Sequence, residues 1–98
     1  MDYSQFNHTL DMAKPPEDFH DILKALWWER KGEWDFAHDI IQNLHGKDAA
    51  WVHAYLHRKE GDIGNANYWY SAAGVSPGKE GLVEEFREIT KYMLEKLF

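Results

Sequence analysis

A turn motif that occurs twice limits what this chain of 98 residues can fold into. Residues 32–37 read Gly-Glu-Trp-Asp-Phe-Ala, and residues 61–66 read Gly-Asp-Ile-Gly-Asn-Ala. Both copies have glycine, an acid, an apolar residue, two variable residues and alanine. Glycine ends helices because it tolerates the left-handed conformation, and an acid after it can cap the next helix. The motif therefore predicts two sharp turns, each between two helices.

Apolar residues with helical spacing flank these turns. The first helix is predicted within residues 18–31, where one stripe holds Phe19, Ile22, Leu23, Leu26 and Trp27. Further helices are predicted over residues 33–45, 49–59 and 63–73, and the expected stops are Gly32, Gly46, Gly61 and Gly74. Asp48 and Asp62 are the expected N-caps of the last two of these helices.

The two ends of the chain are also predicted to be helical. A weak helix is expected within residues 4–13, in an N-terminal segment 1–15 that Pro15 and Pro16 close. A last helix is expected within residues 76–98, with Ser76 as N-cap and Pro77 at its first position. Its apolar stripe is formed by Leu82, Phe86, Ile89, Met93 and Leu97. No segment alternates with period two, so the sequence predicts one all-α domain over residues 1–98.

The repeated turn resembles that of the tetratricopeptide repeat (TPR) family, in which the glycine allows the turn and the alanine lets two helices approach. Ala25 and Ala54, each seven residues before its glycine, stand where that family prefers a small residue. The resemblance covers residues 18–73 and implies two antiparallel helical hairpins, 18–45 and 48–74, in a right-handed α-α superhelix. The last helix would cap it, because terminal repeats need a polar outer face. The whole chain is also similar to small bacterial proteins.

Composition excludes several functional classes. The net charge of −6 disfavours a general nucleic-acid binder, which needs a basic face to displace counterions. The chain has no cysteine, so disulfides, thiolate zinc sites and cysteine nucleophiles are excluded. No apolar run approaches the ~20 residues that span a bilayer, and the N-terminus does not read as a secretory signal. We expect no membrane contact and a cytoplasmic location.

A strip of aromatic and cationic residues is the favoured binding surface. Trp51, Tyr55, Arg58 and Lys59 share one side of a helix. The TPR resemblance implies that the first helix of each hairpin lines the concave face, which adds Glu29 and Arg30 from the preceding hairpin. Rings beside cations suit an acidic or aromatic peptide segment. The alternative is that Trp51 and Tyr55 belong to the core.

A pair of histidines supplies the second candidate site. His53 and His57 have the i, i+4 spacing of two metal ligands on one helix. The glutamate that follows the first histidine in metalloproteases is replaced by Ala54, so that motif is absent. Glu29, His38 or Asp62 could supply a third ligand from a neighbouring helix. The simpler reading is a pair of interior imidazoles bonded to nearby polar groups.

These patterns favour a protein-protein interaction or scaffolding module that binds a protein or peptide, is not an enzyme and needs no cofactor. The alternative function is a metal-binding protein or small metal-dependent enzyme centred on His53 and His57. A third hypothesis is a homodimer in which the stripe of the last helix seals against a second copy. Fold alone does not separate these functions, because helical repeats host many unrelated partners.

Overall fold

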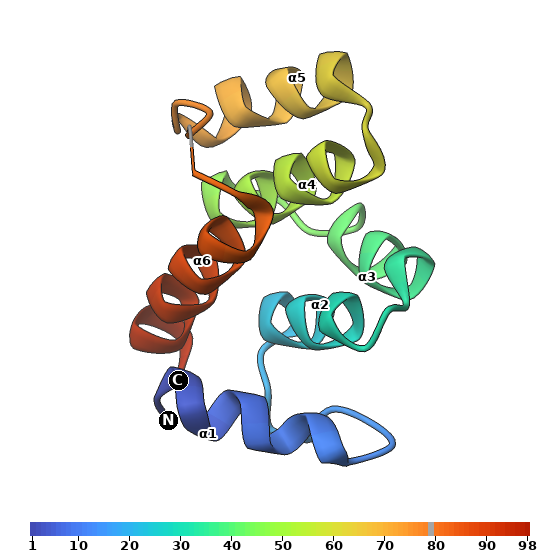
Figure 1. The fold of residues 1–98 in the computed structure, drawn as a ribbon, viewed down its shortest axis with the longest axis vertical. Coiled ribbons are helices and arrows are strands. Elements are labelled where there is room, and N and C mark those ends of the chain that lie inside the picture. The colour runs from blue at the N-terminus through green and yellow to red at the C-terminus, as the bar shows by residue number, and fades with distance from the viewer. Residues whose placement is uncertain (79) are drawn as a thin grey trace.

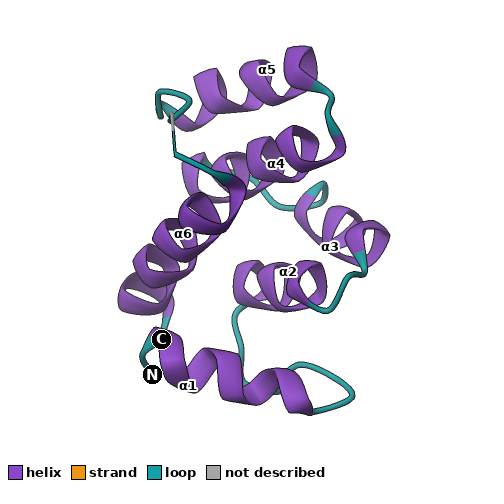
Figure 2. Ribbon diagram, viewed as in Figure 1, coloured by secondary structure: helices purple, strands orange, loops and turns teal. Residues whose placement is uncertain are grey.

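The computed structural model describes residues 1–78 and 80–98, and that part of the chain is built from helices and loops without a strand (Figure 2). Lys79, which falls inside the predicted last helix, lies outside the described residues. The α-helices are α1 (Tyr3–His8), α2 (Asp21–Arg30), α3 (Trp34–Ile41), α4 (Lys47–Glu60), α5 (Ile63–Ala73) and α6 (Leu82–Leu97), and a 3-10 turn at Thr9–Asp11 follows α1. The all-α prediction is confirmed. Within the described residues, no helix combines the length and apolar character needed to cross a bilayer.

Glycines in the left-handed conformation form the two predicted turns. Gly32 joins α2 to α3 with φ +86°, and Gly61 joins α4 to α5 with φ +90°. Each pair of helices folds back and packs closely, and α3 then packs on α4 (Figure 1). Asp62 caps α5 as predicted, because its side chain accepts a hydrogen bond from the backbone N–H of Asn65. The local chemistry of these turns therefore pairs α2 with α3 and α4 with α5.

Two predicted helix boundaries are wrong. Gly46 does not end the second helix, because α3 stops at Ile41 and Gly46 is instead the N-cap residue of α4. Asp48 consequently lies in the first turn of α4, where it pairs with Lys96 of α6 at 2.8 Å.

The last helix also begins later than predicted. Ser76 and Pro77 do not start it, since α6 begins at Leu82 with Gly81 as N-cap residue. The guanidinium of Arg58 donates to the backbone carbonyl of Glu80 at 2.7 Å, which holds the preceding segment against α4. A long-range contact therefore contributes to the position at which α6 starts.

Helix α6 lies across the side formed by α1, α2 and α4, rather than over the outer face of α5 (Figure 1). Its stripe residues Phe86, Ile89 and Met93 are fully buried within the chain's own core. Burying a side chain of this size stabilises the fold by about 1.5–3 kcal/mol. The stripe is therefore not free to seal a homodimer in this fold.

Aromatic rings fill much of this core. The largest fully buried side chains are Trp27, Tyr55, Phe6 and Phe86. The indole of Trp27 donates to the hydroxyl of Thr9 at 3.1 Å, which ties the N-terminal segment to α2. Phe19, just before α2, contacts the C-terminal residue Phe98 edge-on. The N- and C-terminal ends of the chain lie close together (Figure 1). Aromatic side chains thus form much of the small core.

Candidate functional site

Three histidines from two helices meet between α3 and α4. His38 comes from α3, and His53 and His57 are one turn apart on α4. The Nε2 atoms of His38 and His53 are 3.2 Å apart, and one ring nitrogen from each of the three lies within 4.8 Å of the others. We call these three residues the histidine cluster. The spacing of His53 and His57 along α4 brings two imidazoles together. The packing of α3 on α4 adds the third, that of His38.

Two tryptophans stack on the cluster. The indole of Trp34 lies parallel to His38 at 4.9 Å between ring centroids, and that of Trp69 lies parallel to His53 at 4.0 Å. The Nε1 of Trp34 donates to the backbone carbonyl of Leu56 at 2.8 Å, which fixes this ring. The stacked indoles restrict how the two imidazoles can rotate, so the cluster is held in place by its walls.

Burial keeps His53 uncharged. His53 and His57 are each only 6% exposed. Burial, together with the neighbouring His38 and His57, lowers the pKa of His53 from 6.5 to about 4. At neutral pH this imidazole is therefore uncharged, which is the form that binds metal ions.

A carboxylate orients the third ring. Nδ1 of His57 lies 2.6 Å from Oε2 of Glu60, one turn further along α4. Since a carboxylate only accepts hydrogen bonds, Nδ1 donates its proton to Glu60, and in the neutral ring Nε2 then has the free lone pair. Metal-binding histidines commonly donate their second nitrogen to a carboxylate in this way.

The spacing suits a tetrahedral ion such as zinc. Zinc–nitrogen bonds of about 2.0–2.1 Å separate two ligand nitrogens by about 3.3 Å. The 3.2 Å between His38 and His53 agrees with that value. His57 has to move closer to complete the geometry, and its exposed partner Glu60 leaves room for such a shift. The donor set is chemically appropriate, because imidazole suits zinc, copper, nickel and iron.

A cavity of about 370 Å³ opens beside His53. Its walls include His53, Trp69 and the small side chains of Ala49, Ala50 and Ala72. Lys47 and Gln42 add polar groups to it. One ligand of the histidine cluster is therefore reached from solvent through this space.

The predicted aromatic-cationic strip lies against α6 and is only partly at the surface. Tyr55 is fully buried and Glu29 is 2% exposed, so the expectation that Tyr55 faces a partner is wrong. Lys59 forms an ion pair with Glu29. The guanidinium of Arg30 lies 3.9 Å above the ring of Phe86 and 3.5 Å from the hydroxyl of Tyr55. A shallow cavity of about 330 Å³ remains where Arg30, Tyr55 and Lys59 meet Leu82 and Val83.

The other two strip residues contact a buried carboxylate, Glu85 of α6. The guanidinium of Arg58 donates to Glu85 at 2.5 Å, and the indole N–H of Trp51 donates to Glu85 at 3.3 Å. The hydroxyl of Tyr70 donates to the same carboxylate. Burial, together with this hydrogen bond, raises the pKa of the Tyr70 hydroxyl. Trp51 and Arg58 therefore link α4 to α6.

Sequence reasoning named only part of this arrangement. Of the third ligands considered, His38 reaches the pair, Glu29 is paired with Lys59, and Asp62 groups with His57 and Glu60 at the surface. The role of Glu60 was missed, although its i, i+3 spacing from His57 is a usable signal. Comparisons with protein-family models, curated proteins and solved structures found no match. The site is interpreted from its own geometry.

Proposed function

We propose that this protein binds a divalent transition-metal ion, zinc in the first instance, through His38, His53 and His57. The carrying observation is the convergence of three imidazoles from two helices, with two Nε2 atoms 3.2 Å apart. The uncharged imidazole of His53 need not lose a proton before it binds, and His57 is oriented by Glu60.

The alternative account of the cluster is an interior hydrogen bond between His38 and His53 with no ligand. That bond uses one proton and one lone pair, so it explains two of the three rings. It gives no reason for a third imidazole, His57, to pack against both rings while its Nδ1 is hydrogen-bonded to Glu60. Three convergent ring nitrogens favour the metal.

Calorimetric titration of the tag-free full chain with Zn²⁺ tests this function. We expect one ion per chain, and at a free concentration of 100 times Kd the ion should stabilise the fold by about 2.7 kcal/mol. His53→Ala should weaken binding by at least about a hundredfold, since one of three ligands is lost. His8→Ala, at an exposed histidine outside the cluster, is the matched control and should bind as the parent does.

The outcome that overturns the proposal is also defined. Absence of saturable binding would exclude it, as would binding that survives simultaneous replacement of His38, His53 and His57 by alanine. Circular dichroism of each variant separates loss of a ligand from loss of the fold.

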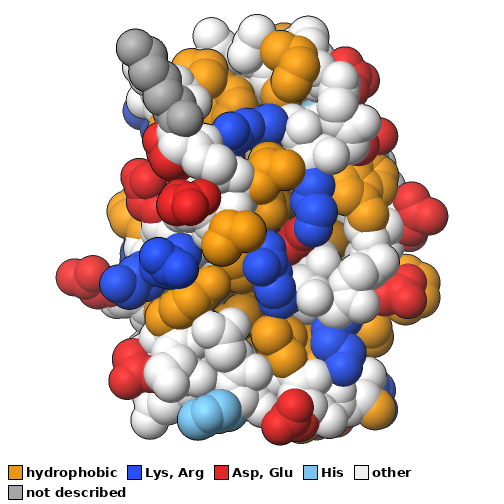
Figure 3. Space-filling model, viewed as in Figure 1, with side chains coloured by type: hydrophobic (Ala, Val, Ile, Leu, Met, Phe, Trp, Pro, Cys, Tyr) orange, Lys and Arg blue, Asp and Glu red, His pale blue; other side chains and the backbone are white. Residues whose placement is uncertain are grey.

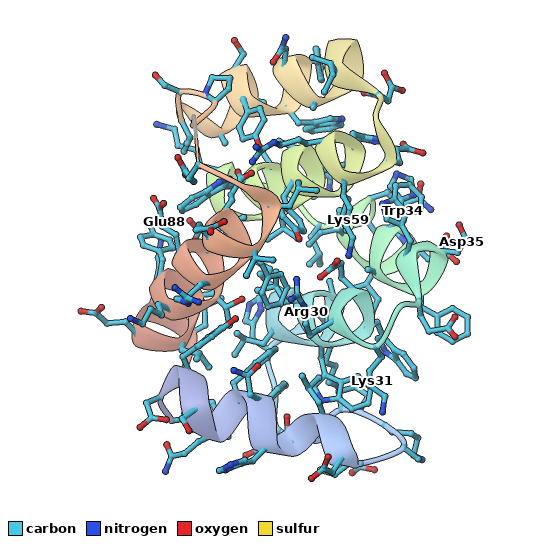
Figure 4. The ribbon with its side chains drawn as sticks, viewed as in Figure 1. Arg30, Lys31, Trp34, Asp35, Lys59 and Glu88 are labelled. Carbon is cyan, nitrogen blue, oxygen red and sulfur yellow. The ribbon has the colours of Figure 1, made fainter. Side chains whose placement is uncertain are left out.

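A peptide-binding module is a second candidate, and we infer it from the cavity beside Arg30 and Lys59. In this proposal α2–α3 and α4–α5 are two TPR-like hairpins of a right-handed superhelix, and α6 fills most of their concave side. Lys59, Arg30 and Lys31 follow one another down the face in Figure 4, and Figure 3 shows cations there alternating with apolar side chains. An acidic segment complements this face.

A labelled hexaglutamate peptide, with hexalysine as the charge control, tests this second candidate. Binding should be salt-dependent and should weaken in Lys31→Gln. The Lys31 ammonium donates to the backbone carbonyls of Leu10 and Met12 and lies 5.4 Å from the centre of the Trp27 ring, without an acidic partner among these contacts. Equal binding of the two peptides, or none of either, would rule it out.

A further inference from the structure

The donor set of the histidine cluster leaves one coordination position of a bound ion without a protein ligand. We propose that this position is exchangeable and takes water or a small anion. This inference rests on the proposed metal function. Structural zinc sites have four protein ligands, whereas sites that keep an open position have three.

The described residues offer three imidazole donors to an ion at the histidine cluster. Among residues 1–78 and 80–98, the group that includes His38 and His53 has His57 as its only further member. Glu60 already accepts the Nδ1 proton of His57, which places it behind that ligand. A tetrahedral ion bound by three imidazoles therefore has one position left.

The cavity beside His53 gives small molecules a route towards a bound ion. The cavity beside His53 has a volume of about 370 Å³, roughly ten times the share of one water molecule in the liquid. Small side chains keep it open, and Ala72 of α5 lines it while being exposed. Water or an ion of a few atoms can enter beside the indole of Trp69, which itself covers one face of His53.

Charge selects the kind of ligand. Three neutral imidazoles leave the two positive charges of the ion uncompensated, and Glu60 offsets one of them only through His57. Lys47 adds a further cation to the cavity wall. The open position therefore favours a small anion, such as hydroxide, azide or a carboxylate, over a neutral ligand of the same size.

Cobalt(II) is the probe, because its visible absorption reports coordination number and ligand exchange in a site suited to zinc. The full chain is loaded with Co²⁺ and titrated with azide. We expect a tetrahedral spectrum that shifts saturably as one azide binds. A spectrum that does not respond to azide would show a closed site and overturn this inference while leaving metal binding intact. Failure to bind Co²⁺ or Zn²⁺ would overturn both.

Two variants of α5 test whether the anion enters through the cavity. Ala72→Leu narrows it without touching a ligand and should weaken azide binding about tenfold, equivalent to about 1.4 kcal/mol. Its affinity for Co²⁺ should stay within about threefold of the parent value. Ser71→Leu is the matched control, since Ser71 is exposed on the same helix and lies outside this cavity. Equal azide binding by all three proteins would exclude this route.

A variant of Glu60, the carboxylate bonded to His57, tests the alternative that this side chain is itself the fourth ligand. In Glu60→Gln, the proposal predicts that the azide-induced spectral change is retained. If Glu60 occupies the fourth position in the parent, the parent spectrum responds little to azide and the variant responds strongly. That pattern would overturn the inference.

Discussion

Two polar clusters on opposite sides of α4 differ in the kinds of contact that their members make. On one side, the carboxylate of Glu85 accepts hydrogen bonds from Arg58, Tyr70 and Trp51. Its charge is matched by the guanidinium, and three donors fill its oxygens. On the other side, the rings of His38, His53 and His57 pack against one another, and a hydrogen bond joins His38 to His53.

The difference separates a structural network from a candidate ligand site. The contacts of Glu85 join α4, α5 and α6, so they are explained by the fold they hold together. The histidine cluster brings one ring nitrogen from each of three residues within 4.8 Å of the others, and that convergence is the reason to assign it a ligand.

The largest expected effect on stability is at the cluster around Glu85. Glu85→Ala leaves Arg58 and Tyr70 without their acceptor, and we expect a loss of about 3–5 kcal/mol in the free energy of unfolding. Urea denaturation measures it. Glu84→Ala, at the exposed neighbouring acid, is the control and should change stability by less than about 0.5 kcal/mol. A loss below about 1 kcal/mol at Glu85 would mean that the network is not structural.

The next effect is on the histidine side and leaves the fold alone. Glu60→Gln removes the carboxylate that orients His57, and loss of such a partner typically lowers metal affinity 10–100-fold. The exposed side chain of Glu60 gives little reason for a loss of stability in the metal-free protein. Competition against a zinc chelator measures the affinity. An unchanged affinity would argue that His57 is not a ligand.

Local signals predicted the elements around the site well. Helix α5 begins at Ile63 and ends at Ala73 as expected, because Asp62 caps it and glycines bound it on both sides. The predicted stripe of α6 is also confirmed, with Phe86, Ile89 and Met93 buried. In each case, the determining interactions lie within the helix or one turn beyond it.

What failed depends on contacts between distant segments. Tyr55 was expected at the surface because its helix face is aromatic and cationic, and only the path of α6 over α4 shows that this face is covered. His53 and His57 were paired correctly from their spacing. The choice of His38 over Glu29 or Asp62 requires the packing of α3 on α4, which periodicity does not specify.

The pH dependence of the metal-free protein gives a smaller effect specific to the histidine cluster. The pKa of His53 is lowered to about 4 from 6.5, so the unfolded chain binds more protons between these values. Stability is therefore fully present above about pH 6.5 and falls as the pH drops towards 4, by an amount on the order of 2 kcal/mol. Urea titrations in chelator at several pH values measure it.

His53→Gln is the control for that measurement, because glutamine does not titrate and carboxylates elsewhere contribute equally in both proteins. The free energy of unfolding of the parent, minus that of the variant, should decrease as the pH falls. If the two curves run parallel from pH 7 to about pH 4, burial is not depressing the pKa of His53 and the cluster is better solvated than the geometry indicates.

The smallest effect concerns the second carboxylate on the α6 side. Glu29 is paired with Lys59 and lies 3.5 Å from Arg30, whose guanidinium stacks on Phe86. Arg30→Lys keeps the charge and loses the planar stack, so we expect a loss of about 0.5–1 kcal/mol. Lys31→Arg, at the adjacent exposed position, is the reverse exchange and should be neutral. A loss as large as that of Glu85→Ala would mean that the guanidinium is needed to satisfy Glu29. The α6 side would then contain two carboxylates that depend on arginine, and the histidine cluster would be set against a more extensive structural network.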